Sequence, residues 1–398
     1  MQQKIAVGID VGTYHVKVVI AERAADPKMP PRILGTGYAE SRGLRHGYTI
    51  SIPEATRGIR AAVAQASTAA RIKSVKSAYL GLGGEGLDEA FSRGEVVIER
   101  GDSLVSERDM QRALAASEAA LAPALILNRK IIHRVPLRWS VDGARVLGKN
   151  PVGMKGARLA IESLFITCPT RHVEDLTEAV EQAGIEVEDI VAAPVAASFV
   201  TLTKMQKRVG CVLANLGSET LSIAVFEDDA PISIKVFPTG AADISGDIAL
   251  GLKVPIEEAE QLKLGAVIGA PYSQKKLNDI IGKRVTSMFK LVEAHLKKIG
   301  KDELLPAGII LTGGGAGVTT IADIAQAVVR LPARVAPLSA GEAGKMQLRD
   351  GSWAVAYGLT IWGLNGREEL EPQESGSVSD ALSGTFGGVW KILKKFLP

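Results

Sequence analysis

Short apolar runs, each bounded by glycine or polar residues, recur along this chain and predict buried strands. One run predicts a strand over Lys4–Asp10, and a second predicts a returning strand over Val16–Ala21. Gly12 and Thr13 lie in the turn between them. The segment therefore predicts a strand, a tight glycine turn and a strand that comes back beside the first.

The second half of the chain repeats this pattern. Gly210–Leu216 and Leu221–Phe226 predict two strands around the turn Gly217–Thr220. A further buried strand over Ala307–Leu311 runs through the glycines 313–315 into a helix that begins near Thr320. A glycine run between a strand and a helix lets a flat ligand approach the backbone. The order of strands, turns and a following helix indicates an α/β protein whose second half repeats the pattern of the first.

Between the halves lies a segment with its own elements, residues 85–163. It predicts strands over Glu95–Arg100, Arg129–Arg138 and Arg158–Phe165, and a helix over Ser106–Ala122 that opens with the N-cap run Ser106-Glu107-Arg108-Asp109. Further on, Ser273–Lys301 predicts a helical region with a basic face. The lysines and arginine of that face are Lys275, Lys276, Lys283, Arg284, Lys290, Lys297 and Lys298. Such a run of charge is either a solvated face or a site for an acidic partner.

The last stretch, Gly384–Pro398, predicts an amphipathic helix. Its apolar stripe has helical spacing and consists of Phe386, Val389, Trp390, Leu393, Phe396 and Leu397. Lys391, Lys394 and Lys395 lie on the opposite side. Bulky aromatic residues with lysine as the only charge favour binding at a membrane surface, and the segment is too short to span a bilayer. The alternative is a terminal helix that docks on the protein's own core.

Composition narrows the choice of function. The chain has 398 residues, enough for two or three domains, with 46% hydrophobic residues and a formal net charge of +3. So small a charge, with no basic patch interleaved with aromatic residues, argues against a nucleic-acid partner. Cys168 and Cys211 lie in apolar runs and are expected to be buried thiols in a reducing compartment. The N-terminus has no hydrophobic signal core, so we expect a cytosolic protein that touches the membrane from inside.

The glycine turns suit phosphate chemistry. Backbone N–H groups in such turns point at an anion, Thr13 adds a hydroxyl, and Lys17 adds a charge. Asp10, at the first turn, is suited to a metal-bound water. An ordinary β-hairpin can carry the same residues, so this motif alone leaves both interpretations open.

Taken together, the motifs resemble the superfamily of actin, the DnaK-type chaperones and the sugar kinases, in which ATP lies between two similar halves. The chain resembles most closely the FtsA family of bacterial cell division. The motifs that carry this resemblance are Ser41-Arg42-Gly43 with Gly47, Asn150–Gly153 with Met154 and Gly156, Asp247-Ile248-Ala249, and Glu257–Glu260 leading to Lys263. The likeness extends from about Lys4 to Gly363 and resumes in the terminal helix.

The resemblance implies a nucleotide site for ATP and Mg²⁺. Its residues are Asp10 (also the metal ligand), Gly12, Thr13 and Lys17 in the first turn, Asn215, Gly217, Ser218 and Thr220 in the second, Glu260 and Lys263 toward ribose and adenine, and Gly314 and Gly315 against the adenosine. Glu260 and Lys263 lie one helical turn apart, and an ordinary surface ion pair would have the same spacing.

One departure from the family pattern affects catalysis. The family's second turn begins with Asp and continues with three glycines, whereas this chain has Asn215 and then Gly217-Ser218-Glu219. Asn cannot act as an anionic ligand or as a base, and Glu219 would repel a phosphate if it pointed at one. We therefore expect ATP binding with at most very slow hydrolysis, and no catalytic residue is assigned.

The resemblance also implies an actin-like α/β fold of two lobes with duplicated mixed sheets, which divides into subdomains along the chain. It predicts an actin-like subdomain 1A (1–84 and 164–205), an inserted α+β subdomain 1C (85–163), subdomains 2A (206–246 and 302–365) and 2B (247–301), a flexible linker (366–383) and a membrane-targeting helix (384–398). The implied partners are other copies of the chain in filaments, anionic lipids of the inner membrane, the C-terminal tail of the tubulin-like FtsZ, and later division proteins. Arg284, Lys283 and Lys290 are the candidate contacts for the FtsZ tail.

The implied location is the cytoplasmic face of the membrane at the division site. The nearest alternative is the related actin-like protein of type IV pilus assembly, which needs no amphipathic helix of its own. A sugar kinase is a third alternative, and Asn215 argues against its turnover. A DnaK-type chaperone would need a further β-rich domain after about residue 365.

Overall fold

The computed structural model describes residues 5–366 apart from 25, 27–28, 100, 149, 266–272, 338–347 and 349. Residues 367–383 of the predicted linker and the whole predicted helix 384–398 lie outside the described residues. Within the described part of the chain, every helix is too short or too polar to cross a bilayer.

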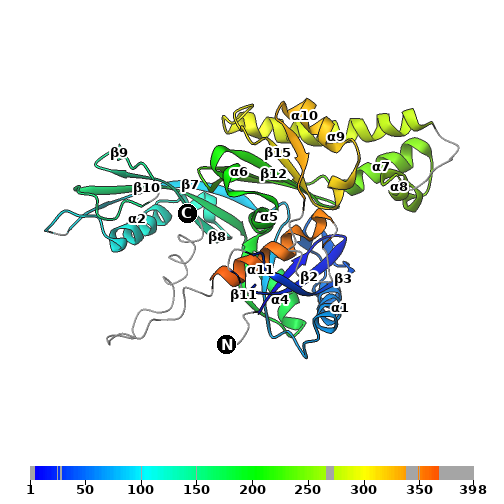
Figure 1. Cartoon of the computed structure of the whole chain (residues 1–398), viewed down its shortest axis with the longest axis horizontal. Coiled ribbons are helices and arrows are strands. Elements are labelled where there is room, and N and C mark those ends of the chain that lie inside the picture. The colour runs from blue at the N-terminus through cyan, green and yellow to red at the C-terminus, as the bar shows by residue number, and fades with distance from the viewer. Residues whose placement is uncertain are drawn as a thin grey trace.

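The first lobe is built on a five-stranded mixed sheet in the order β11-β6-β1-β2-β3 (Figure 1). β1, β2 and β3 are antiparallel neighbours, and β6 and β11 run parallel to β1. The strands are β1 (Ile5–Val11), β2 (His15–Glu22), β3 (Arg32–Glu40), β6 (Ser77–Leu82) and β11 (Glu186–Ala192). The helices of this lobe are α1 (Ile52–Ala70), α4 (Thr170–Gln182), α5 (Ala193–Thr201) and α11 (Ala354–Gly366). Apart from Asp10 near its end, β1 is apolar, as expected for a central strand that is covered on both faces.

The second lobe repeats this topology. Its sheet has the order β14-β13-β12-β15-β16, with β12, β13 and β14 antiparallel and β15 and β16 parallel to β12. The strands are β12 (Cys211–Leu216), β13 (Leu221–Glu227), β14 (Ala230–Phe237), β15 (Ile309–Thr312) and β16 (Ala333–Val335). The helices are α7 (Ala241–Leu252), α8 (Ile256–Lys263), α9 (Gln274–Lys298) and α10 (Ile321–Val329). The prediction of a two-lobed α/β fold with duplicated mixed sheets is confirmed.

The two lobes share a hydrophobic core. Cys211, Leu213 and Phe226 on one face of the second sheet belong to the same buried cluster as α5 and α11 of the first lobe. The opposite face packs on α9 and α10 in a separate cluster. α6 (Lys204–Val209) connects the lobes. Both cysteines are free and fully buried, as predicted.

The inserted segment forms a separate four-stranded antiparallel sheet, β7-β10-β8-β9, with α2 beside it (Figure 1). Its elements are β7 (Asp88–Val97), α2 (Glu107–Ala119), α3 (Pro123–Ile126), β8 (Arg129–Val141), β9 (Ala144–Arg145) and β10 (Arg158–Pro169). Ser106 caps α2 as predicted, in a capping box with Asp109.

Several predicted element bounds were wrong. The strand expected over Glu95–Arg100 begins at Asp88 and ends at Val97, because long pairing with β10 recruits the polar residues at its start into the sheet. β8 and β10 likewise extend to Val141 and Pro169, beyond the predicted ends. The long basic helix is present as α9, with Ser273 at its N-cap position.

Four short elements complete the described chain. β4 (Leu44–Arg45) and β5 (Tyr48–Thr49) form a small hairpin. Short 3₁₀ turns cover Gly314–Gly317 and Gly351–Trp353.

Candidate functional site

The first glycine turn joins β1 to β2. The Gly12 N–H donates to the His15 carbonyl at 3.1 Å and closes the turn. Asp10 and Lys17 are directly opposite each other on the two strands. Burial raises the pKa of Asp10, and the charge of Lys17 opposes this rise. The turn therefore brings a carboxylate and an ammonium group to its end, as the sequence predicted.

The second glycine turn joins β12 to β13 and has the same construction. The Gly217 N–H donates to the Thr220 carbonyl at 2.8 Å. The N–H groups of Ala241 and Ala242, in the first turn of α7, donate to the carbonyls of Gly217 and Ser218 at 2.9 and 2.8 Å. The start of α7 is thus occupied in holding this turn in place.

The glycine run after β15 lies against the second turn. Gly313 has φ +90°, and a Cβ there would lie 2.3 Å from the Asn215 Oδ1, so this position requires glycine. A Cβ on Gly315 would lie 3.0 Å from the Leu216 side chain. At Gly314 the nearest atom to such a Cβ is the Ser352 Cβ, 3.9 Å away, so Gly314 faces more open space. Asn215, Gly217, Gly314 and Gly315 therefore belong to one region of the second lobe.

Glu260 and Lys263 join this region from α8. The Lys263 Nζ lies 2.8 Å from the Glu260 carboxylate and 3.2 Å from the Ala241 carbonyl, in the first residue of α7. Lys263 is buried at 7% exposure, which is not the geometry of an ordinary surface pair. Ser245 donates to Glu260 at 2.5 Å. Burial would raise the pKa of Glu260, but hydrogen bonds from Lys263 and Ser245 outweigh it and lower the pKa.

Glu219 connects the two lobes. Its carboxylate accepts a hydrogen bond from the His46 backbone N–H at 2.6 Å. His46 belongs to the hairpin between β4 and β5, and Ser41, just before that hairpin, donates its N–H to the Tyr14 carbonyl in the first glycine turn. The segment from Ser41 to His46 therefore links the first turn to the second, and Glu219 is directed at backbone of the opposite lobe.

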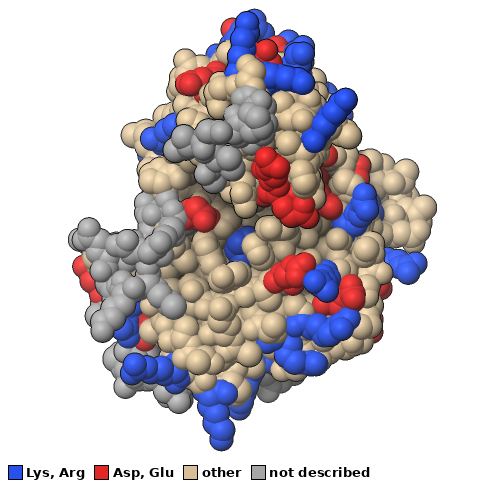
Figure 2. Space-filling model, turned by 90° about the vertical axis from the view of Figure 1, so that its right-hand side faces the viewer, with Lys and Arg blue, Asp and Glu red and all other residues tan. Residues whose placement is uncertain are grey.

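A hollow lies between the two parts of the molecule in a side view (Figure 2). A basic side chain surfaces within it, and acidic side chains gather above it (Figure 2). On the second lobe, α8 begins with Glu257 and Glu258 in its first turn. The candidate nucleotide residues thus come from turns and helix ends of both lobes.

The region offers few ligands for a metal ion. Among the described residues, no group of three or more His, Cys, Asp and Glu side chains is placed to hold a metal. Mg²⁺ commonly takes one or two carboxylates and completes its shell with water and substrate phosphates. Asp10 fits that mode, and Asn215 adds no negative charge.

The predicted partner-binding residues all lie on α9. Lys283 and Lys290 line an open groove of about 500 Å³, together with Asn278, Asp279, Gly282, Thr286 and Ser287. Arg284 instead makes two hydrogen bonds to Asp247, at 2.6 and 2.8 Å. The two lysines therefore lie in the groove, while the arginine is engaged within the chain. The predicted membrane residues between Phe386 and Leu397 lie outside the described residues.

Two contacts at the site, and one between the inserted sheet and the second lobe, were not predicted from the sequence. Ser245 and His46 hold Glu260 and Glu219, and Glu89 of β7 accepts a hydrogen bond of 2.6 Å from the Ile234 N–H of the second lobe. These contacts join residues far apart in the chain, so local spacing carries no signal for them. Ser245 adjoins the Asp247-Ile248-Ala249 motif, the closest hint in the sequence.

Comparison with known proteins places these features in a family. A family model described as "Cell division protein FtsA" matches residues 212–358, and one described as "SHS2 domain inserted in FTSA" matches residues 86–167. The cell division protein FtsA of Borreliella burgdorferi is 30% identical over 385 residues, covering 91% of this chain and 91% of that protein. FtsA of Neisseria meningitidis is 30% identical over 419 residues and covers 100% and 98%.

Solved structures show the same fold at low identity. The type IV pilus biogenesis complex PilM-PilN contains a chain with a TM-score of 0.63 and 16% identity, covering 90% of this chain and 98% of that one. MreB5 of Spiroplasma citri bound to ADP has a TM-score of 0.53 and 12% identity, covering 92% and 99%. These likenesses establish an actin-like fold.

Proposed function

The chain belongs to the FtsA family of cell division proteins, and on that premise we propose that it is an ATP-binding membrane anchor of the division ring. In this proposal it polymerises on the cytoplasmic face of the membrane at the division site and holds the tubulin-like FtsZ there. It also recruits later division proteins. Family membership favours this function over the pilus and sugar-kinase alternatives.

The observation that supports nucleotide binding is the ion pair between the buried Lys263 and the partly exposed Glu260. Through the Ala241 carbonyl, this pair contacts the same helix turn that holds Gly217 and Ser218. A ligand with a ribose at one end and phosphates at the other would contact the Lys263–Glu260 pair with its ribose and the turn at Gly217 and Ser218 with its phosphates. Supporting residues are Gly12, Thr13, Lys17 and Thr220 for phosphates, and Gly314 and Gly315 for the adenosine. MreB5, which has the same fold, was solved with ADP.

Each part of the site would have its own task. ATP would supply negatively charged phosphates on which the two lobes can close. Asp10 would bind Mg²⁺ through water or directly. The carboxylate of Glu219 is engaged by the His46 N–H, and in this proposal that bond keeps its charge from barring the phosphates. Because Asn215 cannot serve as a base, hydrolysis would be at most very slow. Bound nucleotide then sets the geometry of the lobes rather than driving turnover.

Membrane attachment would rest on residues 384–398. The apolar stripe from Phe386 to Leu397 enters the lipid interface, and Lys391, Lys394 and Lys395 each gain about 1 kcal/mol near anionic lipid. A single helix of this size binds reversibly, and an array of copies in a filament binds much more strongly. The tether, expected over 366–383, would begin after Gly366, because that residue ends α11. The subdomain bounds expected from the sequence are otherwise retained as part of this proposal.

FtsZ would dock on α9. The groove beside Lys283 and Lys290 is open, and both lysines can pair with acidic residues of an extended tail. Arg284 would act indirectly, because its two bonds to Asp247 fix α9 against α7.

Co-sedimentation with anionic vesicles tests the anchor. We expect the intact chain to pellet, more completely with ATP, and both Trp390→Glu and a chain lacking residues 384–398 to stay in the supernatant. If all three remain in the supernatant at low salt, the terminal helix is not a membrane anchor. If all three pellet equally, another surface binds the lipid.

A further inference from the structure

The outer edge of β7 is a long strand edge in the inserted sheet. β7 has ten residues, contains no proline and pairs with β10 without a register shift. Among the described strands, none pairs with its other edge. Exposed edges of this length are usually shortened, bulged or covered, since their free backbone groups can pair with another strand.

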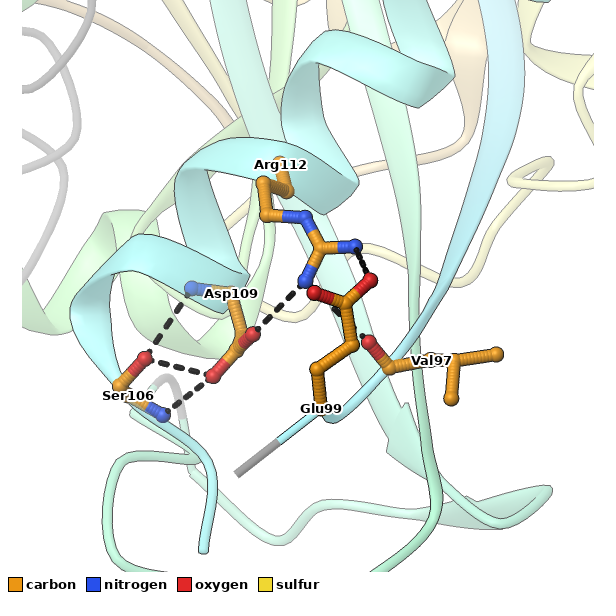
Figure 3. Close-up of polar contacts among 5 residues, drawn as sticks. All are labelled: Val97, Glu99, Ser106, Asp109 and Arg112. Carbon is orange, nitrogen blue, oxygen red and sulfur yellow. Dashed lines mark hydrogen bonds and ion pairs between the residues drawn. The ribbon is translucent and has the colours of Figure 1, made fainter. Parts of the chain in front are cut away.

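The direction of the backbone groups follows from one hydrogen bond. The Ile98 N–H, just after β7, donates to the Ala157 carbonyl at 2.9 Å. The backbone N–H and C=O groups of the even-numbered residues therefore point toward β10, and those of the odd-numbered residues point away from it. Consistent with this, the Val97 carbonyl accepts a hydrogen bond from Arg112 of α2 at 3.3 Å (Figure 3). The outward residues of the exposed stretch are Phe91, Arg93, Glu95 and Val97.

Both ends of this edge are defined by contacts. At the Val97 end, Arg112 also pairs with Glu99 and with Asp109, the residue that completes the cap of α2 with Ser106 (Figure 3). At the other end, Asp88 pairs with Lys235 of β14 at 3.5 Å. The stretch between, from Phe91 to Val97, is about 20 Å long.

One face of this edge is also accessible. Phe91 and Val97 are 52% and 56% exposed, and the side chains of Arg93 and Glu95 are 59% and 40% exposed. The other face is closed by α2, since a Cβ on Gly94 would lie 2.2 Å from the Ala113 carbonyl. A strand added beside β7 would therefore be covered by α2 on one face of the sheet, and its side chains on the other face would be exposed.

The sequence of the edge is complementary to itself. In an antiparallel pairing of two copies centred on Gly94, Arg93 lies opposite Glu95 of the second copy, and Phe91 lies opposite Val97 of the second copy. Directly opposite residues interact most strongly, and opposite charges there are favourable. If the pairing is centred on residue 93 instead, Arg93 lies opposite Arg93 of the second copy. If it is centred on residue 95, Glu95 lies opposite Glu95 of the second copy. Within its own chain Glu95 pairs with Arg93 at 3.4 Å and with Arg158 at 3.1 Å, but Arg93 and Glu95 both stay exposed. The charges therefore favour the register centred on Gly94 over its two neighbours.

We propose that β7 is an interface between two copies of this chain, paired antiparallel about Gly94 in a continuous sheet. The contact uses the same surface on both copies, so it closes as a two-fold pair and does not by itself extend into a filament. It requires neither nucleotide nor membrane, and it is independent of the proposed function.

Disulfide trapping tests the register in the full-length chain. Residues directly opposite in the pairing have Cα atoms about 5.5 Å apart, within disulfide reach, whereas 93 and 93, or 95 and 95, are diagonal at about 7 to 8 Å. Tagged Arg93→Cys chain is mixed with an equal amount of untagged Glu95→Cys chain under mild oxidation. The native Cys168 and Cys211 are fully buried and do not compete. Arg138→Cys, on β8 of the same sheet, replaces Arg93→Cys in the control.

We expect the mixed dimer to exceed either same-variant dimer by roughly fivefold or more, and no dimer with Arg138→Cys. A statistical mixture of the three dimers, or none at about 100 μM, overturns the proposal. Dimers that form only after deletion of residues 384–398 would assign the edge to the chain's own terminal segment and also overturn it.

Charge reversal provides the second measurement. Arg93→Glu alone should weaken self-association in sedimentation velocity by roughly tenfold, and Arg93→Glu with Glu95→Arg should restore it, because the swap recreates both pairs. If the double variant stays as weak as the single one while both unfold at the wild-type temperature, the pairing is wrong.

Discussion

The carboxylate of Glu219 accepts a 2.6 Å hydrogen bond from the backbone N–H of His46, and this bond crosses from the second lobe to the first. Glu219 lies in the same turn as Gly217. His46 lies in the hairpin of β4 and β5, and Ser41, three residues before β4, donates its N–H to the first glycine turn. The carboxylate of Glu219, which would repel a phosphate if it pointed at one, thus connects the two glycine turns through His46.

Removing this bond should loosen the nucleotide-free protein. We expect Glu219→Ala to cost about 1 to 2 kcal/mol of stability, because a charge-assisted hydrogen bond is lost at a partly buried site. Glu219→Gln keeps an acceptor oxygen and should lose less than half of that. Thermal unfolding without nucleotide measures both variants. Equal losses for the two would mean that the charge, rather than the bond, matters there.

Lys263 should be decisive for nucleotide binding. Lys263→Met keeps the length of the side chain but leaves the Glu260 carboxylate without its ammonium partner. We expect ATP affinity to fall at least about tenfold, the equivalent of one charged hydrogen bond. Isothermal titration measures it, with Lys283→Met in the α9 groove as the matched control. An unchanged affinity in Lys263→Met would place the nucleotide elsewhere.

Two glycines should respond to alanine in opposite directions. Gly47 has φ +82°, and a Cβ there would lie 2.3 Å from the Gly84 Cα, so Gly47→Ala should cost about 2 to 4 kcal/mol through strain and displaced backbone. Gly282 is in the interior of α9 with no atom near such a Cβ, and Gly282→Ala should stabilise by about 0.5 to 1 kcal/mol. Chemical denaturation compares them. A tolerated Gly47→Ala would contradict the close approach of the hairpin to Gly84.

His295 should make stability depend on pH. Burial, with help from Lys235 and Lys298 and against Asp88, lowers the pKa of His295 to about 4. The folded state therefore disfavours the proton, so this contribution is present above pH 6.5 and is lost as the pH falls from 6.5 toward 4. Partial solvation limits the effect to about 2 kcal/mol.

A neighbouring carboxyl group acts in the opposite sense. Burial raises the pKa of Glu89, whose hydrogen-bond partner Ser233 also contacts His295, and such a group adds stability as the pH falls. Comparing wild type with His295→Gln by thermal unfolding at pH 7 and pH 5 isolates the histidine. The wild type should lose more stability than the variant, and parallel losses would contradict the assignment.

Sequence reasoning succeeded where the determinants are local. The strand–turn–strand units around Gly12 and Gly217 are apolar runs broken by glycine, and the cap of α2 at Ser106 is a short-range motif. It failed where tertiary packing decides. The spacing of Glu260 and Lys263 fits a surface pair equally well, and only the contact between α7 and α8 buries the lysine. Likewise, Arg284 has the same local sequence signal as Lys283, yet Asp247 engages it.

If this chain links the tubulin-like ring protein to lipid, it should recruit FtsZ to vesicles. FtsZ is sedimented with anionic vesicles and ATP, alone, with the intact chain, with the chain lacking residues 384–398, and with Lys283→Glu/Lys290→Glu. We predict that FtsZ pellets only with the intact chain. If FtsZ stays in the supernatant while the intact chain itself pellets, or if FtsZ pellets equally with the truncated chain, this chain does not link FtsZ to lipid through its terminal helix.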